Sequence, residues 1–247
     1  MIVQTWNVNG RGTQAAVELG DTLRADVLPL QEAKLDGTPG WKTTRSNVHD
    51  NGWGSGIFVR EGSLTAIDVA DYDGWVAGAK WTRSVGGREE STYLFSIHSP
   101  TGRDGHPRKS YVAESRAIVK SISNSAEVPA GARVIIGGDF NFKSLGERHA
   151  SEALPTGSDE LAALTEFRSA EYCVAWKDLN SGYPLAQTLR WTGNQATPFH
   201  CDGFLLKGFD VNGAHCSVLS SAHVHSSSDH SPVVVWIPNA GPAIRPS

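Results

Sequence analysis

The stretch Val134-Ile135-Ile136-Gly137-Gly138-Asp139-Phe140-Asn141 joins a short apolar run directly to a polar cluster. An apolar run of this length between turn residues predicts a buried strand, and the Asx residues after it favour a turn. The same order recurs at Trp6-Asn7-Val8-Asn9-Gly10, Leu30-Gln31-Glu32 and Ile97-His98-Ser99-Pro100, and a polar cluster precedes the last apolar run at Ser228-Asp229-His230-Ser231-Pro232. The sequence therefore predicts several buried strands with polar side chains at their ends.

Strand-like and helix-like segments follow one another in a mixed order. Strands are predicted near 2–8, 26–30, 57–59, 64–69, 75–82, 92–98, 134–136, 188–192, 202–206, 210–218 and 233–237. Helices are predicted near 13–24, with Thr13 as the N-cap, and near 110–123 and 159–169. Since strands outnumber helices without strict alternation, we expect an α/β protein with two packed sheets and helices outside them. Residues 1–237 are expected to form one domain and residues 238–247 a flexible tail.

The bulk composition is that of a folded globular protein. Of the 247 residues, 39% are hydrophobic and 19% are charged, and the chain has no low-complexity run. The net charge of −4 and the pI of about 6.1 argue against a protein that coats nucleic acid by bulk electrostatics. These values are compatible with an enzyme that binds nucleic acid transiently through a bound cation and a few local basic residues.

The cysteines and the N-terminus bear on the compartment. Cys173, Cys201 and Cys216 lack the spacing of a zinc site, so free thiols in a reducing compartment are expected. The chain begins with a strand-like segment instead of a signal peptide, and no stretch approaches the length of a membrane span. We therefore expect a soluble, cytoplasmic monomer without membrane contact; secretion is the alternative if a signal peptide has been removed.

Several of the polar side chains at the strand ends suit a cation and a phosphate. Glu32 and Asp229 are anionic oxygen donors of the kind that Mg²⁺ prefers. Asn7 and Asn141 carry neutral amides that can position a ligand or a phosphate oxygen without added charge. Each of these residues alone is explained by a turn or a solvated charge, so only the combination indicates a site.

Acid–base groups complete the set. Asp139 can orient or deprotonate water, and His98 and His230 can donate hydrogen bonds to a phosphate. Asp202, in His200-Cys201-Asp202-Gly203-Phe204-Leu205-Leu206, can hold an imidazole in one tautomer. A cation, a positioned water and donors around phosphorus are what phosphate-ester hydrolysis requires.

The order WNVNG, LQE, GWGSGIF, IHSP, GGDFN, CDGFLL and SDHSP, from Trp6 to Pro232, resembles the endonuclease/exonuclease/phosphatase superfamily with its DNase I-like fold. The resemblance implies a four-layer α/β sandwich, two packed mixed sheets flanked by helices, with the site at one edge of both sheets. It implies Mg²⁺ as the cofactor, with Mn²⁺ as the alternative. It also implies Glu32 as the main metal ligand, Asn7 beside it, and Asp229 as a further ligand or a residue of a second metal.

The resemblance assigns the remaining motif residues to the reaction itself. Asp139 and Asn141 would orient the attacking water and contact the phosphate, and His230, paired with Asp202, would contact the scissile phosphate. Either Asp139 or His230 can then be the general base. At the position of His98, apurinic-site endonucleases of the superfamily usually carry Tyr, whereas DNase I-like and phosphatase-like members carry His. No acidic partner for His98 is evident before Ile57, so an abasic-site repair role is in doubt.

Clues to the substrate are fewer. Arg103, with Asn9, is a candidate substrate-binding residue, and Arg103 belongs to a basic cluster with His106, Arg108 and Lys109. Trp176 and Trp191 lie in regions that could form a rim on which bases stack, although core or surface packing is the favoured role for each. We expect a nuclease acting on DNA in preference to RNA. The alternatives are a hydrolase of a small or lipid phosphate, and a binding module that has lost catalysis.

Overall fold

A computed structural model describes residues 1–34, 38–46, 49, 52–100, 110–142, 158–180, 186–190 and 199–238. One six-stranded sheet, sheet A, has the order β11-β12-β1-β2-β4-β3. Its strands are β1 (Ile2–Asn7), β2 (Val27–Ala33), β3 (Lys42–Arg45), β4 (Gly54–Val59), β11 (His215–Val218) and β12 (Val233–Trp236). In this sheet β1 and β2 run parallel, and β12 is antiparallel to β1.

The other six-stranded sheet, sheet B, has the order β5-β6-β7-β8-β10-β9. Its strands are β5 (Ser63–Ile67), β6 (Val76–Val85), β7 (Arg88–His98), β8 (Val134–Asp139), β9 (Cys173–Val174) and β10 (Asp202–Lys207). Here β7 and β8 are parallel and β10 is antiparallel to β8. Both sheets are therefore mixed, as predicted.

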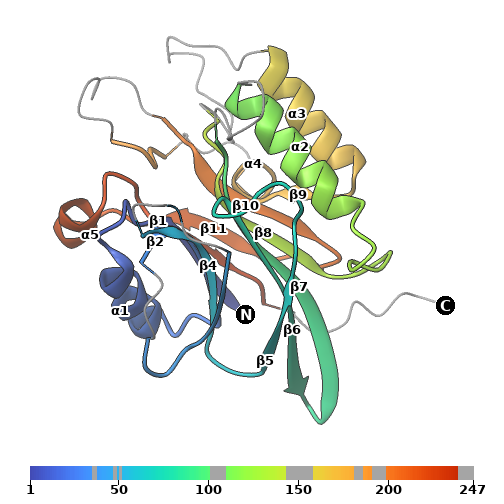
Figure 1. The fold of residues 1–247 in the computed structure, drawn as a ribbon, viewed down its shortest axis with the longest axis horizontal. Coiled ribbons are helices and arrows are strands. Elements are labelled where there is room, and N and C mark those ends of the chain that lie inside the picture. The colour runs from blue at the N-terminus through green and yellow to red at the C-terminus, as the bar shows by residue number, and fades with distance from the viewer. Residues whose placement is uncertain are drawn as a thin grey trace.

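The two sheets pack face to face and helices cover their outer faces (Figure 1). Helices α1 (Thr13–Leu23) and α5 (Ala222–Ser227) lie on sheet A, while α2 (Tyr111–Ser123) and α3 (Ser158–Ser169) lie side by side on sheet B. The short α4 (Ala175–Leu179) follows β9. Trp81, Leu94 and Phe204 are among the buried side chains between the sheets. The four-layer sandwich expected from the sequence is confirmed.

Two local features hold the strands close together beneath the polar edge. A β-carbon on Gly138 would lie 2.0 Å from the carbonyl oxygen of Ile97, so only glycine lets β8 approach β7 here. The buried side chain of Gln31, on sheet A, donates to Thr5 Oγ1 at 3.1 Å and to Ser96 Oγ, on sheet B, at 2.9 Å. This buried hydrogen bond fixes the two sheets relative to each other directly beside Glu32.

Some local predictions are wrong in detail. Thr13 is the first helical residue and Gly12 the N-cap; the Thr13 hydroxyl instead accepts from the Lys34 N–H at 3.0 Å. The strand predicted at 210–218 begins only at His215, because Asp210 accepts from the backbone of Asn212 in a turn.

In the region predicted as a strand at 188–192, Leu189 makes only isolated bridges, and residues 191–192 lie outside the described part of the chain. The sequence patterns did not predict β3, β9, α4 and α5, which have two to six residues each. No helix among the described residues is long and apolar enough to cross a membrane. The predicted tail lies outside the described residues beyond Pro238.

Candidate active site

The strand register brings polar side chains together at one edge of both sheets. His98 ends β7 and lies opposite Asp139, the last residue of β8, which in turn lies opposite Asp202, the first residue of β10. On sheet A, Asn7 ends β1 and Glu32 lies next to the end of the parallel β2. Residues scattered over some 200 positions of sequence therefore become neighbours.

Asn7 links the carboxylates of the two sheets. Its side-chain Nδ2 donates to Glu32 Oε1 at 2.9 Å and to Asp139 Oδ2 at 3.0 Å. Asn7 is buried, whereas the side chain of Glu32 keeps 21% of its surface exposed. The amide thus orients two carboxylates, and Glu32 faces the solvent side of the edge.

His98 lies between these two carboxylates. Its Nε2 atom is 3.7 Å from Glu32 Oε1 and 3.9 Å from Asp139 Oδ2. Burial lowers the pKa of His98 to about 4, so its imidazole is neutral at physiological pH. The rings of Trp53 and Trp75 pack against it at centroid distances of 5.8 and 5.1 Å. Among the described residues, the buried Nδ1 atom of His98 has no hydrogen-bond partner.

His230 and Asp202 form a buried pair across the two sheets. His230 Nδ1 lies 2.9 Å from Asp202 Oδ2, and His230 Nε2 lies 3.8 Å from Asp139 Oδ2. Burial alone would lower the pKa of His230, but the carboxylates of Asp202 and Asp139 outweigh it and raise this pKa to about 10. Burial, reinforced by the charge of Asp202, raises the pKa of Asp139. The imidazole of His230 is therefore a cation that donates hydrogen bonds.

Two further asparagines connect the surrounding loops to this centre. The backbone N–H of Asn141 donates to Asp139 Oδ1 at 2.8 Å, and its side-chain Nδ2 donates to the carbonyl of Ser99 at 3.0 Å. The side-chain Nδ2 of Asn9 donates to Asp229 Oδ1 at 2.8 Å, and the backbone N–H of Asn9 donates to Asn7 Oδ1 at 3.1 Å. Asp229 thus joins the group through Asn9.

Three of these residues have strained backbone conformations. Asn9, Glu32 and Asn141 have φ values of 49°, 50° and 52°, in the left-handed region that residues with a Cβ rarely adopt. Each such residue costs about 1 kcal/mol. At Glu32 the strain coincides with an irregular register between β2 and β4, which turns its side chain toward the edge. Three of the six described non-glycine residues with positive φ thus lie at this edge, and the others are Arg24, Asp71 and Glu171.

The donor set fits a divalent cation. The four carboxyl groups of Glu32, Asp139, Asp202 and Asp229 outnumber the two cations near them in the described part of the chain, His230 and Arg190, so the site has an excess of negative charge and of hard oxygen donors. Glu32 with Asn7 would hold the cation, and Asp229 is the further candidate. Asp139, Asp202 and His230 also have potential ligand atoms within 4.8 Å of one another. Since His230 Nδ1 is already engaged by Asp202 Oδ2 at 2.9 Å, we assign these three residues to the hydrogen-bonded pair and its neighbour.

Other residues singled out in the sequence lie elsewhere. Trp176 has the packing role that was favoured over a stacking rim, because it is only 8% exposed and its ring centroid lies 5.1 Å from that of His200 in the core. The half-buried Trp53 and Trp75 are the tryptophans beside the site. Arg103, the rest of the basic cluster (His106, Arg108, Lys109) and Trp191 lie outside the described residues. The three cysteines are free thiols, as expected.

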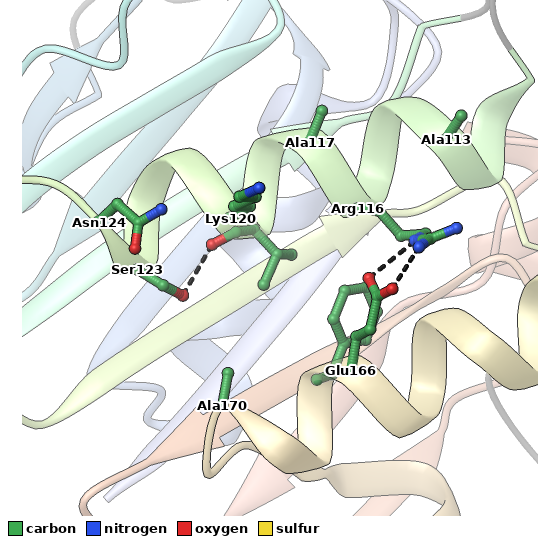
Figure 2. A pocket seen from close by; sticks show the side chains of 10 residues that line it. Ala113, Arg116, Ala117, Lys120, Ser123, Asn124, Glu166 and Ala170 are labelled. Carbon is green, nitrogen blue, oxygen red and sulfur yellow. Dashed lines mark hydrogen bonds and ion pairs between the residues drawn. The ribbon is translucent and has the colours of Figure 1, made fainter.

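A groove of about 610 Å³ lies apart from this edge, between α2 and α3 (Figure 2). Arg116 of α2 and Glu166 of α3 form an ion pair there, with Arg116 Nε 2.8 Å from Glu166 Oε2. None of the candidate catalytic residues lines this groove. The chemistry therefore belongs to the strand ends.

An edge that combines carboxylates, amides and a charged histidine on two packed sheets defines a metal-dependent phosphoric ester hydrolase. The model of the Endonuclease/Exonuclease/phosphatase family matches residues 5–230, and the chain belongs to this family. No curated protein sequence matches the chain.

Solved structures share the fold at low sequence identity. The catalytic domain of Xenopus laevis APE2 has a TM-score of 0.70 at 20% identity, over 96% of this chain and 91% of that one. An AP endonuclease from Archaeoglobus fulgidus has a TM-score of 0.67 at 15% identity, over 96% of this chain and 99% of that one. A mannosyl-6-phosphatase from Bacteroides thetaiotaomicron has a TM-score of 0.62 at 14% identity, over 96% of this chain and 99% of that one. Nucleases and a sugar phosphatase therefore share this architecture.

Proposed function

We propose that the protein is a divalent-metal-dependent phosphodiesterase that hydrolyses nucleic acid, DNA in preference to RNA. The observation that carries the proposal is the meeting of Asp139, His230 and Asp202 with the Glu32–Asn7 pair at one edge. This arrangement provides a buried carboxylate, a fixed imidazolium and a set of cation donors within a few ångströms, as attack of water on a phosphodiester requires.

The charges favour one division of roles. His230 is protonated because its pKa is raised to about 10, so it acts as a hydrogen-bond donor to a phosphate oxygen and not as the base. Asp139 has a raised pKa, which makes its carboxylate a stronger base, and the backbone N–H of Asn141 orients it. Of the two candidates for general base, we therefore favour Asp139. A bound Mg²⁺, or Mn²⁺ as the alternative, would neutralise charge that develops on the phosphate.

The surroundings of His98 support a nucleic-acid substrate. Trp53 and Trp75 place two half-buried indole rings directly beside His98, a candidate hydrogen-bond donor to the phosphate. Indole faces next to a phosphate site are the surfaces on which unpaired bases stack in proteins that bind single strands. The endonuclease structures that share this fold are consistent with such a substrate.

Incubation with supercoiled plasmid and Mg²⁺ or Mn²⁺ tests the proposal. We expect nicking that leaves 5′-phosphate and 3′-hydroxyl ends. Asp139→Asn and His230→Ala should each lower the rate by about 10²–10⁴-fold, the usual contribution of a positioned acid or base. Asp68→Asn, which makes the same charge change at an exposed position, is the control and should cleave normally. Equal nicking by all variants, or none by the wild type, would contradict the proposal.

A second candidate is hydrolysis of a small-molecule or lipid phosphate. It is favoured by the net charge of −4, which gives no bulk attraction to nucleic acid, and by the sugar phosphatase among the similar structures. Turnover of a sugar phosphate, an inositol phosphate or a phospholipid, without cleavage of plasmid or RNA, would select this candidate.

A further inference from the structure

The segment Thr188–Arg190 connects the two halves of the His230–Asp202 pair. Asp202 begins β10 of sheet B, whereas His230 lies just before β12 of sheet A, so the pair spans two separate sheets. The segment lies between them outside any named strand, and Leu189 bridges to Phe199 on one side and to His230 on the other. Its contacts therefore fix the relative position of the two partners.

Arg190 holds four consecutive residues of the loop that carries His230. Its guanidinium Nη1 donates to Ser231 Oγ, and Nη2 donates to the carbonyls of Ser228 at 2.9 Å and of His230 at 3.0 Å. Its backbone N–H donates to the carbonyl of Asp229 at 2.8 Å. One residue thus supplies donors to every residue from 228 to 231.

Thr188 holds the other side. Its hydroxyl Oγ1 accepts from the backbone N–H groups of Cys201 at 2.8 Å and Asp202 at 3.2 Å. Its carbonyl accepts from the N–H of Ser231 at 2.7 Å. Thr188 is fully buried, so these hydrogen bonds are shielded from water. Asp202 and His230 are accordingly attached to the same three-residue segment.

We infer that Arg190 and Thr188 are positioning residues for the reaction, and this inference rests on the proposed hydrolytic function. They hold the backbones of His230 and Asp202 so that His230 Nδ1 stays 2.9 Å from Asp202 while Nε2 faces Asp139. Neither residue touches the reacting atoms in this role. A misplacement of about 1 Å can cost about 10²-fold in rate, so a fixed pair matters for turnover.

The chemistry of the contacts explains why arginine occupies position 190. The acceptors are two carbonyls and a hydroxyl, and both terminal nitrogens of the guanidinium donate to them. A guanidinium offers donors in a rigid planar fork that reaches them together, whereas the ammonium of lysine is a single point with freely rotating donors. Arg190→Lys should therefore restore only part of the function of Arg190.

The test compares Arg190→Gln and Arg190→Lys with Arg60→Gln. Arg60 is a matched control, because it also donates to two backbone carbonyls, those of Ala25 and Gly20, but lies next to α1. With plasmid and with bis(4-nitrophenyl) phosphate, Arg190→Gln should lower kcat by about 10–100-fold and leave KM within about threefold. Arg60→Gln should leave kcat unchanged. Thr188→Val, which lacks the hydroxyl, should lower kcat in the same way, whereas Thr188→Ser, which keeps the hydroxyl, should retain the wild-type kcat.

A proton NMR measurement on the metal-free protein separates this inference from the proposed function. The Nδ1 proton of His230, identified by its loss in Asp202→Asn, should be sharp in the wild type and broadened in Arg190→Gln. An increase in KM with unchanged kcat would assign Arg190 to substrate binding and overturn the inference. Wild-type kcat and a sharp Nδ1 proton in Arg190→Gln, or an equal loss in Arg60→Gln, would also overturn it. If no substrate is turned over by the wild type, the proposed function fails, and the NMR signal alone decides whether Arg190 positions the pair.

Discussion

Replacing Asp202 by asparagine keeps the size of the side chain and removes its negative charge. In the wild type, the carboxylate of Asp202 lies 2.9 Å from His230 Nδ1 and is fully buried. The pKa of His230 is about 10 instead of 6.5, because the charges of Asp202 and Asp139 outweigh burial. This difference corresponds to about 5 kcal/mol of preference for the protonated imidazole. Without the charge and hydrogen bond of Asp202, burial is opposed only by the charges of Asp139 and Asp229, so this pKa should fall from about 10 toward the ordinary value of 6.5.

The change in pKa sets the size and the pH dependence of the activity loss. At pH 8.5 an imidazole with a pKa of about 10 is almost fully protonated, whereas one with a pKa of 6.5 is roughly 1% protonated. If the protonated form donates to the phosphate, Asp202→Asn should lose about 10²-fold in turnover at pH 8.5. Near pH 6 more than half of the variant is protonated again, so the loss should shrink to less than about tenfold.

The raised pKa of His230 should also make the stability of the metal-free protein depend on pH. A raised folded-state pKa contributes stability that is complete below pH 6.5 and is lost as the pH rises toward 10. The wild type should therefore lose up to about 5 kcal/mol of unfolding free energy over this range, and Asp202→Asn clearly less.

Turnover from pH 6 to 9, NMR titration of the imidazole and urea unfolding test this reasoning together, with Asp68→Asn as the exposed control. An unchanged pKa of about 10 for His230 in Asp202→Asn, or full activity of this variant at pH 8.5, would refute it.

Three further predictions concern the cation, the core and the sheet. Glu32→Gln should weaken Mg²⁺ binding in a calorimetric titration by at least about tenfold, because it removes an anionic donor, while the fold remains; unchanged affinity would place the cation elsewhere. Buried His200 has its pKa lowered to about 4 by burial, so the protein should lose about 3 kcal/mol as the pH falls from 6.5 to 4, and His200→Leu should reduce this loss in acid unfolding curves. Gly138→Ala should lower stability by about 3 kcal/mol or more, measured by thermal unfolding, because its Cβ would collide with the Ile97 carbonyl; a wild-type melting temperature would show that β8 can shift.

Much of the fold could be read from local patterns. The apolar runs at 134–136 and 202–206 became strands β8 and β10, because a run of large apolar residues has to be buried whatever its partners are. Ser110 caps helix α2, since its side chain accepts from Ala113 N–H, and the predicted range there was nearly correct. The short elements β3 and α5 were missed, because neither Lys42–Arg45 nor Ala222–Ser227 contains a continuous apolar run.

The candidate site was predictable only as a collection of residues. The motifs named Asn7, Glu32, Asp139 and Asp202, but which of them touch depends on strand order and register. Trp176 gives a second example. The sequence allows this tryptophan to be a rim or a core residue, and only the side chains that pack against it show that it lies in the core.

The motifs at the strand ends were enough to identify the family and the class of chemistry and to name candidate residues, because such short stretches can be recognised in the sequence without knowledge of their neighbours in space. Only the tertiary structure shows that the pKa of His230 is raised, because the two carboxylates that raise it belong to β8 and β10. Only the tertiary structure singled out Arg190, whose hydrogen bonds reach residues about 40 positions away. Contacts over such distances leave no local pattern, since each partner alone is compatible with many environments.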